Sequence, residues 1–190
     1  LHLLSRRQRQ MCIRDRIGLG IFTVIGINVA QSHLEDAHAF ILIVVGVITG
    51  VGGGIIIDGR MLTGTNGAGG EIGHIHIEDA ETETCGCKNK GCLEQYASAT
   101  GITRLANIRL AKDDKASVLR GQEVSAKTVF DAVKADDEVA KEIAEEFGKY
   151  LGHAMANLAA VADPSAIVIG GGVSKAGEVL LQYCLLYTSD

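Results

Sequence analysis

Three cysteines and one histidine, close together in the sequence, constrain this chain more than any other feature. Within residues 71–94, His74 is followed across an acidic stretch by Cys85, Cys87 and Cys92. Thiolates and imidazole are the ligands that zinc prefers, and a set of three cysteines and one histidine closes a tetrahedral shell with no open position. The spacing therefore predicts a structural zinc site and not a Lewis-acid site.

Two other interpretations of these cysteines stay open. Two of them could form a disulfide, or all could remain reduced and pack in the interior. Nothing that resembles a signal peptide precedes them, which predicts a reducing, cytoplasmic compartment, where clustered cysteines more often bind metal than form disulfides. Only His74 is assigned to the metal, because His76, two residues on, would face the other side of a strand.

Composition bounds the remaining possibilities. The chain has 190 residues, of which 47% are hydrophobic and 22% charged, as in a globular domain that can bury a core. Its longest apolar run, residues 39–48, is about half the roughly 20 residues that a membrane-spanning helix needs, so it predicts a buried strand. Net charge is −5, and the only basic cluster lies at the N-terminus. We therefore expect neither a membrane span nor a nucleic-acid surface.

The two ends of the chain do not fit the pattern of the rest. Residues 1–16 lack helical or strand periodicity, and MCIRDR there and CLLYTSD at the other end resemble translated sequencing-adapter sequence. We predict that residues 1–16 and 184–190 are non-native and carry no function, and that the domain occupies 17–183 with its zinc motif at 74–92. A native basic tail at the N-terminus is the alternative.

Hydrophobic patterns predict the order of the elements. Apolar and β-branched runs indicate strands at 17–31, 40–47, 55–57 and 166–169. A glycine loop at 49–54 would join the second and third of these, and the third would turn at Asp58-Gly59. Helical segments are expected at 93–100, at 102–111 and at 125–133, the last of them capped by Ser125. A long helix should follow and end before Pro164, and another should begin at about residue 176.

The long helix carries an apolar stripe that we expect to lie in the core. Its members step by three and four: Val139, Ile143, Phe147, Leu151, Ala154, Leu158 and Val161. His153 lies on the same helix, and we expect it to be a packing or surface residue and not a ligand.

Two motifs in the central segment resemble the ROK family of bacterial sugar kinases and repressors. They are Glu71-Ile-Gly-His74 and Cys85-x-Cys87-x4-Cys92-Leu-Glu94. The resemblance implies that His74, Cys85, Cys87 and Cys92 hold zinc. It also implies that Glu71, His74 and Glu94 bind sugar hydroxyls, which suits carboxylates because they accept paired hydrogen bonds. Lys88 stands where the family usually has glycine.

Two glycine-rich corners resemble the nucleotide contacts of the same family. Thr49-Gly-Val-Gly-Gly-Gly54 is similar to its second phosphate loop, which implies that Thr49 and Gly50 approach the phosphates, although Ile48 replaces a glycine. The corner at 170–174, Gly-Gly-Gly-Val-Ser, is similar to the one against adenosine and implies contacts from Gly171 and Gly172. The implied cosubstrate is Mg-ATP. The loop at 49–54 has neither the Walker A pattern nor that of a dinucleotide-binding motif.

The resemblance covers about residues 28–182 and implies an α/β actin-like ATPase (ribonuclease H-like) fold, mostly one lobe of it. Within the family the motifs are most similar to glucokinases, so the implied reaction is ATP-dependent phosphorylation of glucose or a related hexose at the 6-hydroxyl. The resemblance is also compatible with a homodimer. The alternatives are a sugar-responsive ROK repressor and a non-catalytic, zinc-stabilised sugar-binding module.

The same resemblance predicts that this chain by itself is impaired as a kinase. The family's general-base aspartate aligns with Gly26, which cannot accept a proton, and no Asp-Leu-Gly-Gly-Thr hairpin is found in the sequence. General-base assistance alone is typically worth about 10²- to 10⁴-fold. In a coupled assay with glucose and Mg-ATP we expect turnover far below about one per second, the low end for kinases. Turnover near that value would contradict the prediction.

Overall fold

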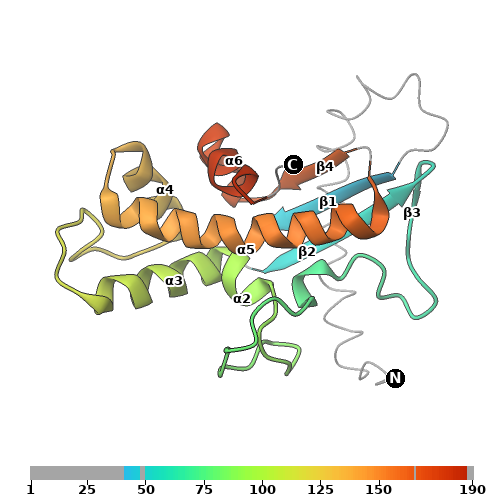
Figure 1. The fold of residues 1–190 in the computed structure, drawn as a ribbon, viewed down its shortest axis with the longest axis horizontal. Coiled ribbons are helices and arrows are strands. Elements are labelled where there is room, and N and C mark those ends of the chain that lie inside the picture. The colour runs from blue at the N-terminus through green and yellow to red at the C-terminus, as the bar shows by residue number, and fades with distance from the viewer. Residues whose placement is uncertain (1–40, 48–49, 165, 188–190) are drawn as a thin grey trace.

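A four-stranded sheet forms one part of the molecule (Figure 1). The structure is a computed structural model that describes residues 41–47, 50–164 and 166–187, the first of these ranges by its backbone alone. The strands are β1 (Ile41–Val47), β2 (Val51–Ile57), β3 (Arg60–Met61) and β4 (Ala166–Gly170). Their order is β3-β2-β1-β4; β1 is antiparallel to β2 and parallel to β4.

The run of three glycines lies inside β2, so its assignment to a loop is wrong. Gly52, Gly53 and Gly54 pair across to β1, and the connection is confined to residues 48–50. The physical reason is close approach by another segment. A Cβ on Gly53 would lie 2.7 Å from the carbonyl oxygen of Gly70, which no real side chain tolerates. The predicted turn at Asp58-Gly59 is confirmed: both residues have positive φ, 49° and 74°, as a tight two-residue hairpin requires.

Helices make up most of the rest of the described chain. They are α2 (Glu94–Ala97), α3 (Ala99–Lys112), α4 (Ala126–Lys134), α5 (Glu138–Ala162) and α6 (Glu178–Leu185), with 3₁₀ turns η2 (Ile72–His74) and η3 (Val173–Ala176). In Figure 1, α5 runs across the front of the sheet and continues between α3 and α4. None of the helices within the described ranges is both long and apolar enough to cross a membrane.

Local side-chain chemistry sets the helix ends. Ser125 caps the start of α4, as the sequence predicted, and it does so in a reciprocal capping box with Thr128. The break between the first two helices comes earlier than expected, at Ser98, because Ser98 is extended and its hydroxyl accepts from the Gly101 N–H at 2.8 Å. Asp163, in the left-handed region, ends α5 directly before Pro164.

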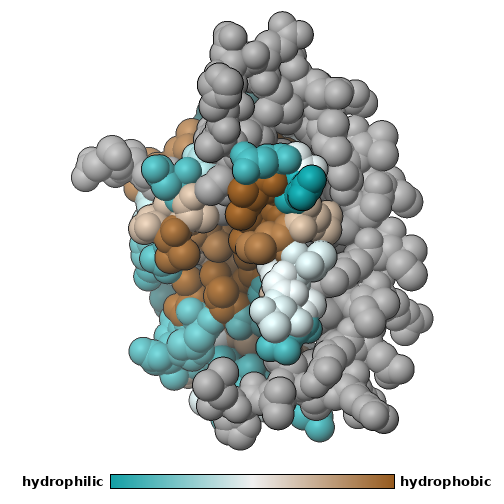
Figure 2. All heavy atoms as spheres, turned by 90° about the vertical axis from the view of Figure 1, so that its right-hand side faces the viewer, coloured by the Kyte–Doolittle hydropathy of each residue, from teal (hydrophilic) through white to brown (hydrophobic). Residues whose placement is uncertain are grey.

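The core is built around α5. The stripe predicted on this helix is buried from Val139 to Ala154, and Leu158 packs at its edge. The prediction that Val161 lies in the core is wrong, because this residue is 88% exposed. The C-terminal turn of α5 lies at the same end of the molecule as β3 (Figure 1), whose last residue, Met61, is also exposed. Figure 2 shows apolar residues gathered on this end.

Helix α6 lies directly against α5 at two glycines, Gly148 and Gly152. A Cβ on Gly148 would lie 2.7 Å from the backbone of Tyr183, and one on Gly152 would lie 2.6 Å from the carbonyl oxygen of Cys184. Cys184 is completely buried there. The expected strand at 17–31 lies outside the described residues.

The contact between α5 and α6 yields a stability prediction. In an exposed helix interior, glycine to alanine stabilises by about 1 kcal/mol. Gly148→Ala should instead lower the free energy of unfolding by about 1–3 kcal/mol, because the added methyl group meets the α6 backbone. Thermal unfolding followed by circular dichroism measures this. The neighbouring exposed Lys149→Ala should change stability by no more than about 0.5 kcal/mol, and a stabilised Gly148→Ala protein would contradict the packing.

Candidate metal and sugar site

The four predicted metal ligands converge at one point. The nitrogen and sulfur donor atoms of His74, Cys85, Cys87 and Cys92 all lie within 4.8 Å of one another. The Cys87 and Cys92 Sγ atoms are 3.5 Å apart, and Cys85 Sγ is 3.8 Å from His74 Nδ1. Around a tetrahedral zinc ion, bond lengths of about 2.3 Å to sulfur and 2.0–2.1 Å to nitrogen place neighbouring donors roughly 3.5–3.8 Å apart. The residues therefore fit a zinc ion.

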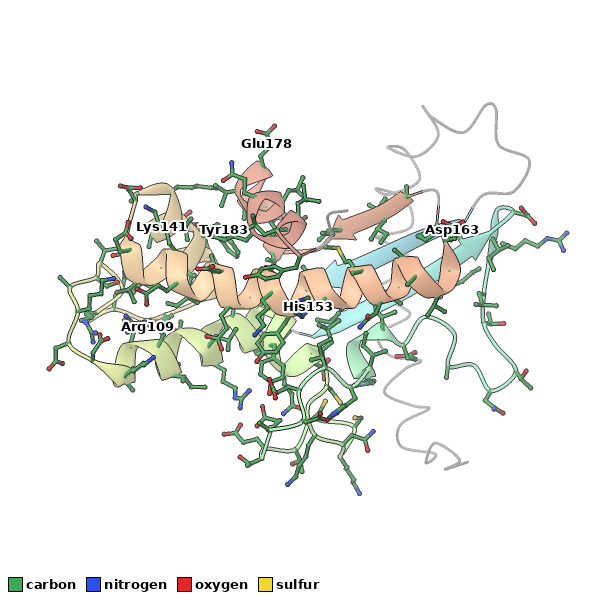
Figure 3. The ribbon with its side chains drawn as sticks, viewed as in Figure 1. Arg109, Lys141, His153, Asp163, Glu178 and Tyr183 are labelled. Atoms are coloured by element: carbon green, nitrogen blue, oxygen red, sulfur yellow. The ribbon has the colours of Figure 1, made fainter. Side chains whose placement is uncertain are left out.

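These cysteines belong to a segment with little regular secondary structure, residues 75–93, which we call the cysteine loop. Its two limbs are joined by single bridges, His76 to Cys92 and Thr84 to Lys90. At the tip, the Cys85 N–H donates to the carbonyl of Asn89 at 2.7 Å. In Figure 3 the sulfur atoms group in this loop below α2.

Lys88 lies in the turn at the tip of the cysteine loop, where its φ is 72°. This is the left-handed region, where a side chain costs roughly 1–2 kcal/mol and glycine costs nothing. The conformation explains why glycine suits this position better than the lysine found here.

His76 is not part of the converging set. Its Nε2 lies 2.7 Å from an oxygen of Asp79, and its Nδ1 lies 3.0 Å from the carbonyl oxygen of Lys90. The hydrogen bond to Asp79 raises the pKa of His76. His153 is exposed on α5 and meets Tyr187 edge to face, as a surface packing residue (Figure 3).

Without a cation, the thiolate form is disfavoured in this site. Burial raises the pKa of Cys92 to about 11, and burial, with a hydrogen bond to Glu94, also raises the pKa of Cys85. The described part of the chain contains no disulfide, and Cys85, Cys87 and Cys92 are all buried. A dication would reverse this preference, because a metal ion deprotonates the thiols that bind it.

Glu94, a predicted sugar ligand, lies beside the predicted metal ligands. It begins α2, and its Oε1 accepts a hydrogen bond from Cys85 Sγ at 3.2 Å. Since the same sulfur contacts His74 Nδ1, Cys85 lies between His74 and Glu94. Glu71, the third predicted sugar ligand, precedes His74 at the start of η2 and is half-buried. All three predicted sugar ligands therefore lie at or next to the metal set.

The described residues that are predicted to contact the nucleotide lie at the end of the sheet that faces this site. Gly50 lies so close to the Glu94 carboxylate that a Cβ there would collide with it. Because β1 and β4 are parallel and Gly46 pairs with Gly170, the glycine corner 171–172 follows β4 at the same end of the sheet. In open α/β sheets, ligands bind outside the carboxyl ends of the strands. Thr49 and Gly26 lie outside the described residues.

A buried carboxylate behind the loop was missed by the sequence reasoning. Glu81 accepts from the Tyr96 hydroxyl at 2.5 Å and from Arg104 at 2.7 Å, and it is the only buried acidic or basic residue in the described ranges. Burial by itself would raise its pKa, but the hydrogen bonds from Tyr96, the Glu83 N–H and Arg104 outweigh burial and lower the pKa to about 2. Its acidic neighbourhood in the sequence resembles a solvated loop and gives no sign of these partners.

The similarity of the chain to known proteins extends over most of its length. Residues 27–186 match the model of the ROK family. The chain belongs to the ROK family. It is 46% identical over 157 residues to the glucokinase of Halalkalibacterium halodurans, a match that covers 78% of this chain and 46% of that protein. It is also 38% identical over 152 residues to the DNA-binding transcriptional dual regulator NagC of Escherichia coli, covering 80% and 36%.

Solved structures of ROK proteins show the same fold. The ROK glucokinase of Streptomyces griseus, in complex with glucose and AMPPNP, matches with a TM-score of 0.72 and 35% identity, over 80% of this chain and 50% of that one. The α/β actin-like ATPase fold and the family resemblance predicted from the sequence are therefore confirmed. The chain spans about half the length of the relatives it matches.

Proposed function

We propose that the chain is the zinc-binding and sugar-binding part of a ROK sugar kinase, which transfers a phosphoryl group from Mg-ATP to glucose or a related hexose. The observation that carries the proposal is the position of Glu94, which lies between Cys85 of the metal set and Gly50 of the predicted phosphate loop. A sugar held by this carboxylate would lie next to the end of the sheet where phosphates are expected. The likeness to glucokinases, one of them in complex with glucose and AMPPNP, supports the same reaction.

In this proposal the ion is structural and the carboxylates bind the sugar. His74, Cys85, Cys87 and Cys92 would hold zinc, which supplies a fixed point for the loop and takes no part in the chemistry. Glu71 and Glu94 accept hydrogen bonds from sugar hydroxyls, and Gly50, Gly171 and Gly172 admit the nucleotide because they have no side chain. Their role is to place the hydroxyl and the phosphate, because phosphoryl transfer depends almost entirely on positioning.

A ROK repressor is the second candidate, and the similarity to NagC supports it. Both candidates use a sugar site, so sugar binding does not separate them. The upstream reading frame of the parent gene does: an Asp-x-Gly-Gly-Thr hairpin indicates a kinase, and a helix-turn-helix indicates a repressor. If neither is present, the zinc-stabilised sugar-binding module remains.

The metal site predicts one zinc ion per chain. Elemental analysis of purified protein should give about one equivalent, because three thiols and one imidazole complete a tetrahedral shell. The Cys87→Ser Cys92→Ser variant should lose the ion and loosen the cysteine loop, because structural zinc contributes to folding. Cys184→Ala, at a buried cysteine in α6, serves as the control and should keep the ion. Less than about half an equivalent in the wild type, or full retention in the double variant, would contradict the assignment.

The sugar site predicts weak binding of glucose that depends on zinc. Each carboxylate–hydroxyl hydrogen bond is worth about 1.5–3 kcal/mol, so two of them support a millimolar site. In an NMR titration, glucose should shift amides of residues 70–74 and 93–94. These shifts should disappear in Glu94→Gln and after chelation of zinc, and should persist in Glu83→Gln, a change at an exposed residue. Absence of shifts at tens of millimolar glucose, or shifts that survive chelation, would refute the site.

A further inference from the structure

The cysteine loop is attached to the helical core by a cluster that we call the Glu81 latch, consisting of Glu81, Tyr96 and Arg104. The Glu81 side chain is 3% exposed. One of its oxygens accepts from the Tyr96 hydroxyl and from Arg104, and the other accepts from the Glu83 N–H at 2.9 Å. A buried carboxylate is tolerated only when it is paired in this way. The latch therefore has one stable arrangement, in which Glu81 is charged and bound to both partners.

The latch acts at both sides of the site. Glu81 lies four residues before Cys85, on the limb that leads to the metal ligands. Tyr96 lies two residues after Glu94, on the same short helix α2. Between them, Gln95 accepts from the Cys92 N–H and donates to the carbonyl of Glu83, both at 3.0 Å. Displacement of Glu81 would thus disturb the limb carrying Cys85 and the helix carrying Glu94 together.

The latch is itself supported from two other helices. The Tyr96 ring stacks on Tyr150 of α5 with centroids 4.1 Å apart, and Arg104 of α3 lies over the same Tyr96 ring at 5.5 Å. The Tyr150 hydroxyl donates to Glu78, at the start of the same limb, at 3.0 Å. These contacts involve no metal ligand, so they are available whether or not a cation is bound.

We propose that Glu81 is a positioning residue that orders the cysteine loop before metal binds, so that the four ligands and Glu94 are already in place. The inference rests on the proposed function for its purpose, but the ordering itself concerns the protein without metal. Three of the four ligands lie on this loop, which has little regular secondary structure and would otherwise depend on the ion and on a few backbone hydrogen bonds for its order. The latch supplies part of that order through tertiary contacts.

Hydrogen exchange of the metal-free protein tests the ordering directly. The informative amides are those of Cys85, Lys88 and Leu93, which donate to carbonyls within the cysteine loop. In Glu81→Gln, which loses the charge but keeps the shape, these amides should exchange at least about tenfold faster, since hydrogen bonds to charged groups are the stronger ones. Amides in the middle of α5 should be unaffected, and they serve as the internal reference for global stability.

Glu83→Gln is the matched control. Glu83 lies on the same limb and contacts the same Arg104 at 3.3 Å, but its side chain is 70% exposed. Exchange in this variant should stay within about twofold of the wild type, as expected for a solvent-screened pair. If Glu81→Gln does not fold, Tyr96→Phe removes one hydroxyl from the latch and retains the ring, and it should accelerate the same amides.

Release of zinc to a chelator provides the second readout and separates this inference from the proposed function. Glu81→Gln should release the ion at least about tenfold faster than wild type and Glu83→Gln. Faster exchange in a chain that binds no zinc supports the latch and refutes the metal site. If Glu81→Gln binds zinc but exchanges its loop amides and releases the ion at the wild-type rates, the latch is overturned and the metal site stands. The latch is also overturned if exchange of the loop amides and of the α5 amides is accelerated equally, because the change then affects global stability.

Discussion

The convergence of three thiols and one imidazole depends on a loop with little regular secondary structure. The cysteine loop, residues 75–93, has two single bridges and a few separate backbone hydrogen bonds in place of a continuous ladder. Ordering such a backbone costs about 1–2 kcal/mol per residue, so side-chain contacts must contribute. Two groups of side chains do so: the ligand cluster, and the buried Glu81 with its partners on α2 and α3.

The sheet provides the second half of the site through its topology. An antiparallel hairpin places Gly50 at the turn after β1, and the parallel pairing of β1 with β4 places Gly171 after β4 at the same end. Residues far apart in the sequence therefore meet at the carboxyl ends of two strands, where α/β proteins bind ligands. Gly50 lies against the Glu94 carboxylate, which would have to move to admit a side chain there.

Helix α5 links these two parts. Its buried stripe forms the core, Gly148 and Gly152 admit α6, and Tyr150 reaches the cysteine loop through Tyr96 and Glu78. The same helix thus determines the position of the C-terminal α6 and of the loop that carries the ligands. A rigid scaffold of this kind is what a binding site on a poorly structured loop requires.

The sequence by itself determined what depends on local chemistry. Ligand type and spacing identified His74 and the three cysteines as one set, capping chemistry predicted the start of α4 at Ser125, and the 3.6-residue period predicted the stripe of α5. These features were predictable because each involves residues that are neighbours in the chain or share one helix face.

The tertiary structure alone decided what depends on long-range packing. It placed the glycine run inside β2, left Val161 outside the core and brought Gly50 against Glu94. It also buried Glu81, whose acidic surroundings indicate a solvated loop until Tyr96 and Arg104 are seen to surround it. The burial of a charge is set by partners distant in the sequence, and no pattern within the segment itself records them.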